Sequence, residues 1–115
     1  MDYRKVREPT TDTDYYLYVP STYGEDRPHR LVITLHGTGP WDVARYQIRA
    51  WDSLAEEKGF IVAAPLLDSA VWPIMFRGSW REDLASDERK ILAVLDHVAG
   101  RYRIDRDRVL LTGFS

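Results

Sequence analysis

The sequence predicts a single α/β domain, with a mostly parallel sheet and helices packed on its faces. Short apolar runs that are typical of buried strands alternate with longer segments whose apolar residues recur every three or four positions. Glycine, proline and polar residues stand between these segments. The expected order is strand, strand, strand, helix, strand, helix and strand, with right-handed crossovers between the later, parallel strands.

Five segments are expected to form strands. They cover residues 3–7, 15–19, 31–35, 60–64 and 109–112. The second is aromatic and β-branched, ends before Pro20, and is expected to pair with the weaker first strand. The last three are nearly continuous apolar runs, which is typical of strands buried on both faces of a sheet. Pro65 is expected to end the fourth strand.

Two segments are expected to form amphipathic helices. The first begins at Asp42, a candidate N-cap, and ends before Gly59 at the C′ position; the second begins at Ser86 and ends at Gly100. The residues expected to face the core are Ala44, Ile48, Trp51, Leu54 and Ala55 in the first helix and Ile91, Leu92, Leu95, Val98 and Ala99 in the second. Residues 66–83 have no clear period and are expected to form a long apolar loop.

The composition argues against several functional classes. The 16 basic and 18 acidic residues are interspersed and give a formal net charge of -2, so neither nucleic acid nor a membrane is an expected partner. The absence of cysteine removes disulfides, thiolate-held zinc and thiol nucleophiles. The first residues lack the apolar stretch of a signal peptide, so a cytoplasmic location is the default expectation. The oligomeric state is left open.

The triplet Gly113-Phe114-Ser115 directly follows the last predicted strand. A Gly-x-Ser triplet alone is weak evidence, because a chain of this length should contain about half of one by chance. The preceding buried strand strengthens it, since a nucleophile elbow needs a strand that ends in a tight turn flanked by small residues. Ser115 is therefore the candidate nucleophile.

Several stretches resemble one group of enzymes. They are residues 16–20, 35–37, 54–65 and 102–115, which include Leu35-His36-Gly37 and Leu111-Thr112-Gly113-Phe114-Ser115. They resemble the N-terminal half of the α/β-hydrolase esterases related to polyhydroxybutyrate depolymerases, feruloyl esterases and dienelactone hydrolases. The resemblance implies that residues 1–115 form the N-terminal portion of an α/β-hydrolase fold, truncated at the nucleophile elbow.

The resemblance also implies an activity. Such enzymes cleave carboxylic esters through an acyl-serine and need no cofactor or metal, so the expected substrate is a small-molecule or polymeric ester. Ser115 would be the nucleophile, and the backbone N–H of Thr38 would stabilise the oxyanion. The residues expected to line the substrate pocket are His36, Gly37, Gly39, Trp72 and Phe114.

In this family the triad acid and base follow the serine, whereas the present sequence stops at Ser115. The polypeptide of residues 1–115 is therefore expected to be an inactive and poorly soluble fragment of a serine esterase. The histidines already present are expected to belong to a polar turn (His29), to the oxyanion loop (His36) and to a solvated helix face (His97). Asp68 and Asp83 are interpreted as loop residues, and Asp87 as a charge at a helix N-terminus.

Three alternatives stay open. Gly37-Thr38-Gly39 resembles part of a dinucleotide-binding loop, but Asp42 replaces the third glycine and would repel a pyrophosphate. A non-catalytic α/β-hydrolase-like binding protein would share the same sequence pattern. The elbow also serves other serine acyl-transfer enzymes, such as peptidases and thioesterases.

Overall fold

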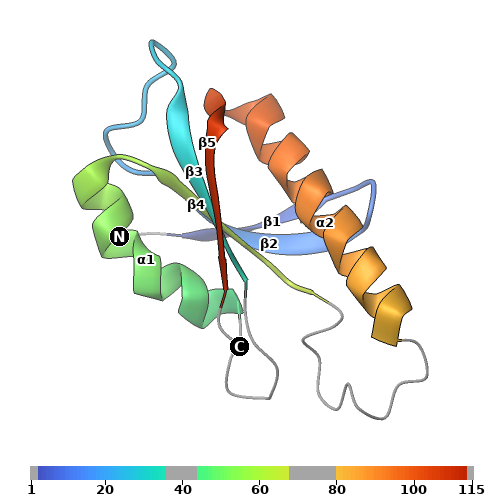
Figure 1. Ribbon diagram of the computed structural model, residues 1–115. Helices are drawn as coiled ribbons and strands as arrows, with labels where there is room; N and C mark the ends of the chain where they lie inside the picture. Colours follow the sequence, from blue (N-terminus) through green and yellow to red (C-terminus); the bar gives the residue numbers. More distant parts are fainter. Residues whose placement is uncertain (1–2, 36–43, 68–79, 114–115) are drawn as a thin grey trace.

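The computed structural model describes residues 3–35, 44–67 and 80–113 (Figure 1). Within these ranges the elements are β1 (Arg4–Glu8), β2 (Thr13–Tyr18), β3 (His29–Leu35), α1 (Ala44–Lys58), β4 (Ile61–Pro65), α2 (Trp80–Arg101) and β5 (Ile104–Gly113). This order of strands and helices confirms the order predicted from the sequence. Pro65 is the last residue of β4, as the sequence predicts.

The strands form one sheet in the order β1-β2-β4-β3-β5. β1 and β2 form an antiparallel hairpin, and β2 also pairs antiparallel with β4. β4, β3 and β5 are parallel to one another, so their carboxyl ends meet at the same edge of the sheet. The predicted pairing of the first two strands and the predicted parallel arrangement of the later ones are both confirmed.

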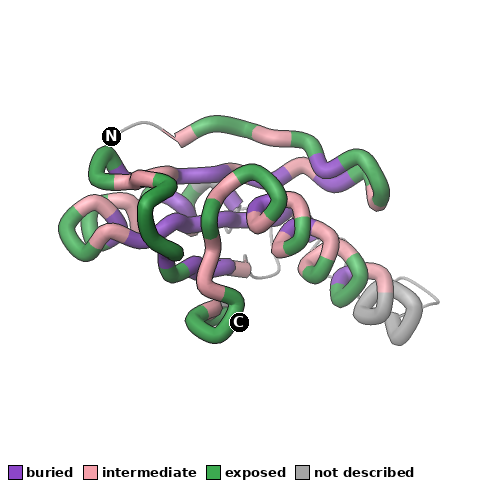
Figure 2. Tube along the Cα trace, turned by 90° about the horizontal axis from the view of Figure 1, so that it is seen from above, coloured by how far each residue is buried: buried purple, intermediate pink, exposed green. Residues whose placement is uncertain are grey.

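The two helices cover opposite faces of the sheet (Figure 1). On one face, Val94 and Val98 of α2 pack on side chains from the central strands; on the other face, Ala44, Ile48 and Ala55 of α1 do the same. Figure 2 shows the buried segments along the middle of the trace and the exposed segments on its outside. This two-sided burial explains why the central strands are continuous apolar runs.

The structure confirms α1 over Ala44–Lys58, with one change in its apolar face; the predicted N-cap Asp42 lies outside the described residues. The helix ends at Lys58, and Gly59 follows in the left-handed region at φ 77°, where its N–H bonds to the carbonyl of Ala55 at 2.8 Å. Leu54, predicted to face the core, is 42% exposed, whereas the adjacent Ala55 is fully buried. One residue along a helix turns the side chain by about 100°, so only one of two neighbours can point at the sheet.

The structure corrects the boundaries of α2. The helix begins at Trp80, so Ser86 lies inside it and is not an N-cap, and Asp83, predicted to be a loop residue, is helical. The helix ends at Arg101, one residue after Gly100. Residues 68–79 of the predicted loop lie outside the described residues. The residues before Ser86 include Arg, Glu, Leu and Ala, which favour helix strongly enough to extend it in the N-terminal direction. Leu92, predicted to be buried, is 53% exposed, whereas Val94, which was not predicted to face the core, is fully buried.

β5 is longer than predicted. It begins at Ile104, where it pairs with His29, and its register shifts before Val109 pairs with Leu31. The charged residues 105–108 occupy this irregular stretch, and their polar pattern does not predict a strand. Among the described strands β5 is at the sheet edge opposite β1, and Leu110 and Leu111 are more than half exposed.

Candidate active site

The carboxyl ends of β3 and β5 lie side by side. Leu35, the last residue of β3, is the register partner of Gly113, the last residue of β5. The neighbouring pair is Thr34 with Thr112. In open α/β sheets, ligands bind at the carboxyl ends of the parallel strands, so this edge is where the fold favours a site.

The predicted site residues follow these strand ends in the sequence. The segment with His36, Gly37, Thr38 and Gly39 follows Leu35, and Phe114 and Ser115 follow Gly113. All six residues, together with Trp72, lie outside the described residues, so their roles stay predictions. The structure does bring together the two strand ends that carry the candidate nucleophile and the candidate oxyanion loop.

A buried hydrogen bond lies beneath this edge, and the sequence analysis did not identify it. Thr34 is fully buried, and its Oγ1 donates to Oε1 of Gln47 in α1 at 2.8 Å. Thr34 is two residues before His36, and Gln47 lies in the first turn of the helix that follows the candidate oxyanion loop. The bond therefore joins the two elements between which that loop runs. A polar residue inside an apolar strand was the available signal.

Two histidines have structural roles that the sequence analysis described differently. His29 is not in a polar turn: it is 3% exposed, begins β3, and its Nε2 is 2.9 Å from the carbonyl oxygen of Gly24. His97 is half-buried rather than solvated, and its Nδ1 is 2.7 Å from the hydroxyl oxygen of Tyr15. Burial raises the pKa of Tyr15, which is consistent with a neutral phenol in this pair. These contacts occupy both histidines in packing.

Asp87 also differs from its predicted role. It lies within α2 and is only 4% exposed, so it is not a solvated charge at a helix N-terminus. Within the described residues, no group of three His, Asp or Glu side chains is arranged to hold a metal ion. Neither described helix has the length and apolar character needed to cross a bilayer.

The sheet order, the antiparallel β2 and the two helices on opposite faces make up part of an α/β-hydrolase fold, as the sequence predicts. Known proteins support this assignment. The chain is 28% identical over 114 residues to a bifunctional acetylxylan esterase/xylanase of Neocallimastix patriciarum, of which it covers 16%. No protein-family model matches the sequence.

Solved structures with the same fold are also esterases and related hydrolases. An acetyl xylan esterase from Aspergillus awamori has a TM-score of 0.68 at 17% identity, with 98% of this chain and 42% of that chain covered. A ferulic acid esterase from Anaeromyces mucronatus has a TM-score of 0.65 at 17% identity, with 100% and 50% covered. The S-formylglutathione hydrolase of Staphylococcus aureus reaches 0.64 at 20% identity, with 97% and 47% covered.

These comparisons confirm the resemblance to serine esterases of the α/β-hydrolase type. The chain spans half or less of the length of the proteins it matches here. Nearly all of the chain, by contrast, is covered in each match. Residues 1–115 therefore match only part of the fold of these proteins.

Proposed function

We propose that the whole protein is a carboxylic-ester hydrolase that forms an acyl-enzyme on Ser115. The observation that carries this proposal is the register of β3 and β5, in which Leu35 and Gly113 are partners at the carboxyl edge. Ser115 is two residues beyond Gly113, and Thr38 is three residues beyond Leu35. An extended chain spans at most about 3.6 Å per residue, so both residues are tethered within roughly 11 Å of this edge.

The proposed reaction has two steps. The Ser115 hydroxyl attacks the ester carbonyl carbon while a general base takes its proton, and the carbonyl oxygen becomes an oxyanion. The tetrahedral intermediate then breaks the bond to the alcohol oxygen, which receives the proton and leaves. Water repeats the sequence on the acyl-serine and releases the acid. In this proposal the general base and its acidic partner come from outside residues 1–115, because His29 and His97 are engaged in packing and His36 belongs to the predicted oxyanion loop.

The backbone N–H of Thr38 is proposed as one oxyanion donor. Glycine on both sides leaves the backbone free to approach the substrate closely. Removing one such donor costs about 2.7–4 kcal/mol of transition-state stabilisation in serine hydrolases. The Thr34–Gln47 hydrogen bond supports the assignment, because it anchors the strand before this loop to the helix after it.

A fluorophosphonate probe tests the nucleophile directly, because it reacts covalently with activated serines. The whole gene product should be labelled at Ser115, as read by mass spectrometry of the labelled peptide. Ser115→Ala should abolish the labelling. Ser53→Ala, at an exposed serine of α1, is the matched control and should leave it unchanged. A folded protein that stays unlabelled, or is labelled at another serine, contradicts the proposal.

The substrate class follows from a second measurement. The relatives named above act, by their names, on acetylated xylan and on ferulic acid esters. We expect hydrolysis of p-nitrophenyl acetate, and the kcat/KM ratio between acetylated xylo-oligosaccharides and methyl ferulate then distinguishes an acetyl esterase from a feruloyl esterase. Turnover of amides or thioesters with no activity on these esters would show that the acyl-transfer mechanism is right and the ester assignment wrong.

A further inference from the structure

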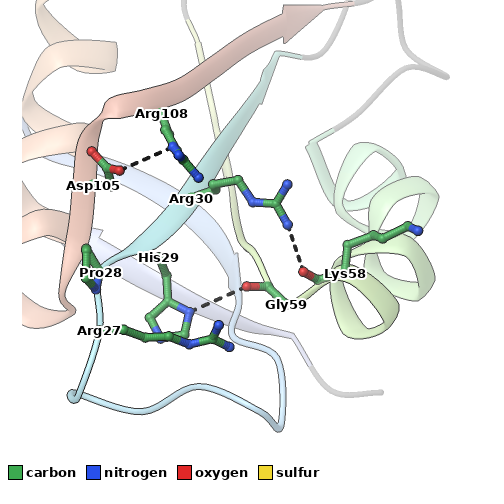
Figure 3. A pocket seen from close by; sticks show the side chains of 8 residues that line it. All are labelled: Arg27, Pro28, His29, Arg30, Lys58, Gly59, Asp105 and Arg108. Atoms are coloured by element: carbon green, nitrogen blue, oxygen red, sulfur yellow. Dashed lines mark hydrogen bonds and ion pairs between the residues drawn. The ribbon is translucent and has the colours of Figure 1, made fainter.

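A basic pocket lies where the parallel strands β3 and β4 begin, at the end of the sheet opposite to the strand carboxyl ends and the candidate active site (Figure 3). It encloses about 200 Å³ beside the amino end of β3, between the end of α1 and the irregular first part of β5. Figure 3 shows its arginines coming from three places: Arg27 from the loop before β3, Arg30 from β3, and Arg108 from β5. The pocket is therefore separate from the edge where β3 and β5 end.

The charge of this pocket is unbalanced. Three arginines line it, against a single carboxylate from Asp105. Lys58 contributes its backbone carbonyl, and its side chain points away from the arginines (Figure 3). The chain as a whole carries a formal net charge of -2, so the positive charge is a local feature and not a reflection of the composition. Like charges gathered around a small space repel one another, and a bound anion relieves that repulsion.

Arg30 is held in place before any ligand arrives. Its Nη2 donates to the carbonyl oxygen of Lys58 at 2.8 Å, and its guanidinium carbon lies 5.8 Å from the centre of the Phe60 ring. The carbonyl end of α1 attracts cations, which accounts for this contact without any ligand. A guanidinium has five N–H donors, so Arg30 keeps further donors for an anion.

The position of Arg27 is not explained by attraction to the carbonyl end of α1. Within the part of the chain that the structure describes, its side chain makes no ion pair at 4.0 Å or less. Its Nη2 lies 4.0 Å from the point where a Cβ on Gly59 would stand, so it sits over the α1–β4 turn. The adjacent Asp26 instead turns back towards Gly24, where its Oδ1 lies 2.7 Å from the corresponding point.

Arg108 is only weakly neutralised. Its Nε is 3.5 Å from Oδ2 of Asp105, and both side chains are partly exposed. Asp105 also accepts a hydrogen bond from the backbone N–H of Asp107 at 3.0 Å, through its other carboxylate oxygen. The Asp105 carboxylate thus contacts the Arg108 side chain and the Asp107 backbone N–H. It does not neutralise the charges of Arg27 and Arg30.

We propose that this pocket binds a phosphate-class oxyanion, either as the free ion or as a phosphate group on a larger molecule. The planar fork of arginine matches the oxygens of such an anion, and two or more arginines can bind it from different sides. The volume is suited to one such group with its water. The inference does not depend on the proposed esterase activity, because none of the pocket residues belongs to the candidate active site.

Titration with inorganic phosphate tests the site, at constant ionic strength maintained with sodium chloride. Amide signals in ¹H–¹⁵N spectra of the whole gene product should shift on addition of phosphate for residues 27, 29 and 30 and for residues 105–108. Arg27→Gln and Arg108→Gln should each weaken phosphate binding about fivefold, the effect expected for losing one partly exposed ion pair. Arg49→Gln, at an exposed arginine of α1 outside this pocket, is the matched control and should leave the affinity unchanged.

Glucose 6-phosphate distinguishes the two sources of the group. Tighter binding of this phosphomonoester than of inorganic phosphate would indicate a phosphate carried on a larger ligand, and the reverse order would indicate the free ion; either result supports the site. The proposal is overturned if chloride produces the same shifts as phosphate, or if the three arginine variants lose affinity equally. Labelling of Ser115 is scored separately, so a failure here does not bear on the proposed hydrolase.

Discussion

Replacing Thr34 with valine tests whether the buried hydroxyl beneath the carboxyl edge ties β3 to α1. Thr34 is fully buried, and its Oγ1 donates to Gln47 Oε1 at 2.8 Å. Valine keeps the shape of the side chain but replaces the hydroxyl with a methyl group. The amide oxygen of Gln47 then loses this donor, while the packing around residue 34 is preserved.

The expected loss of stability follows from that geometry. A protein hydrogen bond contributes about 1 kcal/mol net, and a buried acceptor that loses its donor costs about 1–3 kcal/mol. Gln47 is only half-buried, so water can compensate in part. We therefore expect the free energy of unfolding to fall by about 1–2 kcal/mol, in the lower part of that range.

Urea unfolding of the whole gene product measures this loss. The midpoint should fall while the slope m stays unchanged, because the surface exposed on unfolding is the same. The same substitution at the exposed Thr22 is the control and should change stability by less than about 0.5 kcal/mol. A double-mutant cycle with Gln47→Leu should give a coupling energy of about 1 kcal/mol. Equal effects of Thr34→Val and Thr22→Val, or zero coupling, would refute the reasoning.

Two further predictions concern the hairpin and the helix ends. Glu8 is buried and accepts hydrogen bonds from Thr10 and Thr11; burial alone would raise its pKa, but these bonds lower it from 4.5 to about 2. Glu8→Gln should therefore reduce stability at neutral pH, and the difference from wild type should vanish as pH falls from about 4.5 to 2, as measured by urea unfolding across pH. Gly59→Ala should destabilise the protein by about 1 kcal/mol, because residue 59 has a φ of 77° that alanine adopts only with strain. Gly100→Ala should stabilise the protein by about 0.5–1 kcal/mol, because Gly100 lies inside α2 with open space around it. Thermal unfolding measures both changes.

The type and order of every described element could be predicted from the sequence, because the pattern of apolar residues reflects burial directly. Residues 31–35 and 60–64 are nearly continuous apolar runs, interrupted only by Thr34, and the structure covers them from both faces. Gly59 ends α1 because its φ is one that other residues adopt only with strain. These signals are local, so they do not depend on knowing the rest of the fold.

Element boundaries were harder to predict. The Ser86-Asp87-Glu88 stretch has the composition of a helix start, yet it lies inside α2, because good helix formers precede it and Asp87 is buried by tertiary packing. The charged residues 105–108 do not have the apolar pattern of a strand. They belong to β5 because the residues on either side of them, Ile104 and Val109, pair with His29 and Leu31 of β3. Pairing with a neighbour, and not intrinsic preference, sets such ends.

For the candidate site, the sequence by itself determined the residue types: a Gly-x-Ser after a buried strand, and a glycine-flanked loop after another. Only the tertiary structure decided that the ends of these two strands are adjacent and in register, since residues 35 and 113 are far apart in the chain. It also decided that Thr34 reaches Gln47 and that Arg27, Arg30 and Arg108 surround one pocket. The physical reason is that periodicity records which side of an element is buried, whereas contacts between distant elements depend on the sheet order and register that the whole chain adopts.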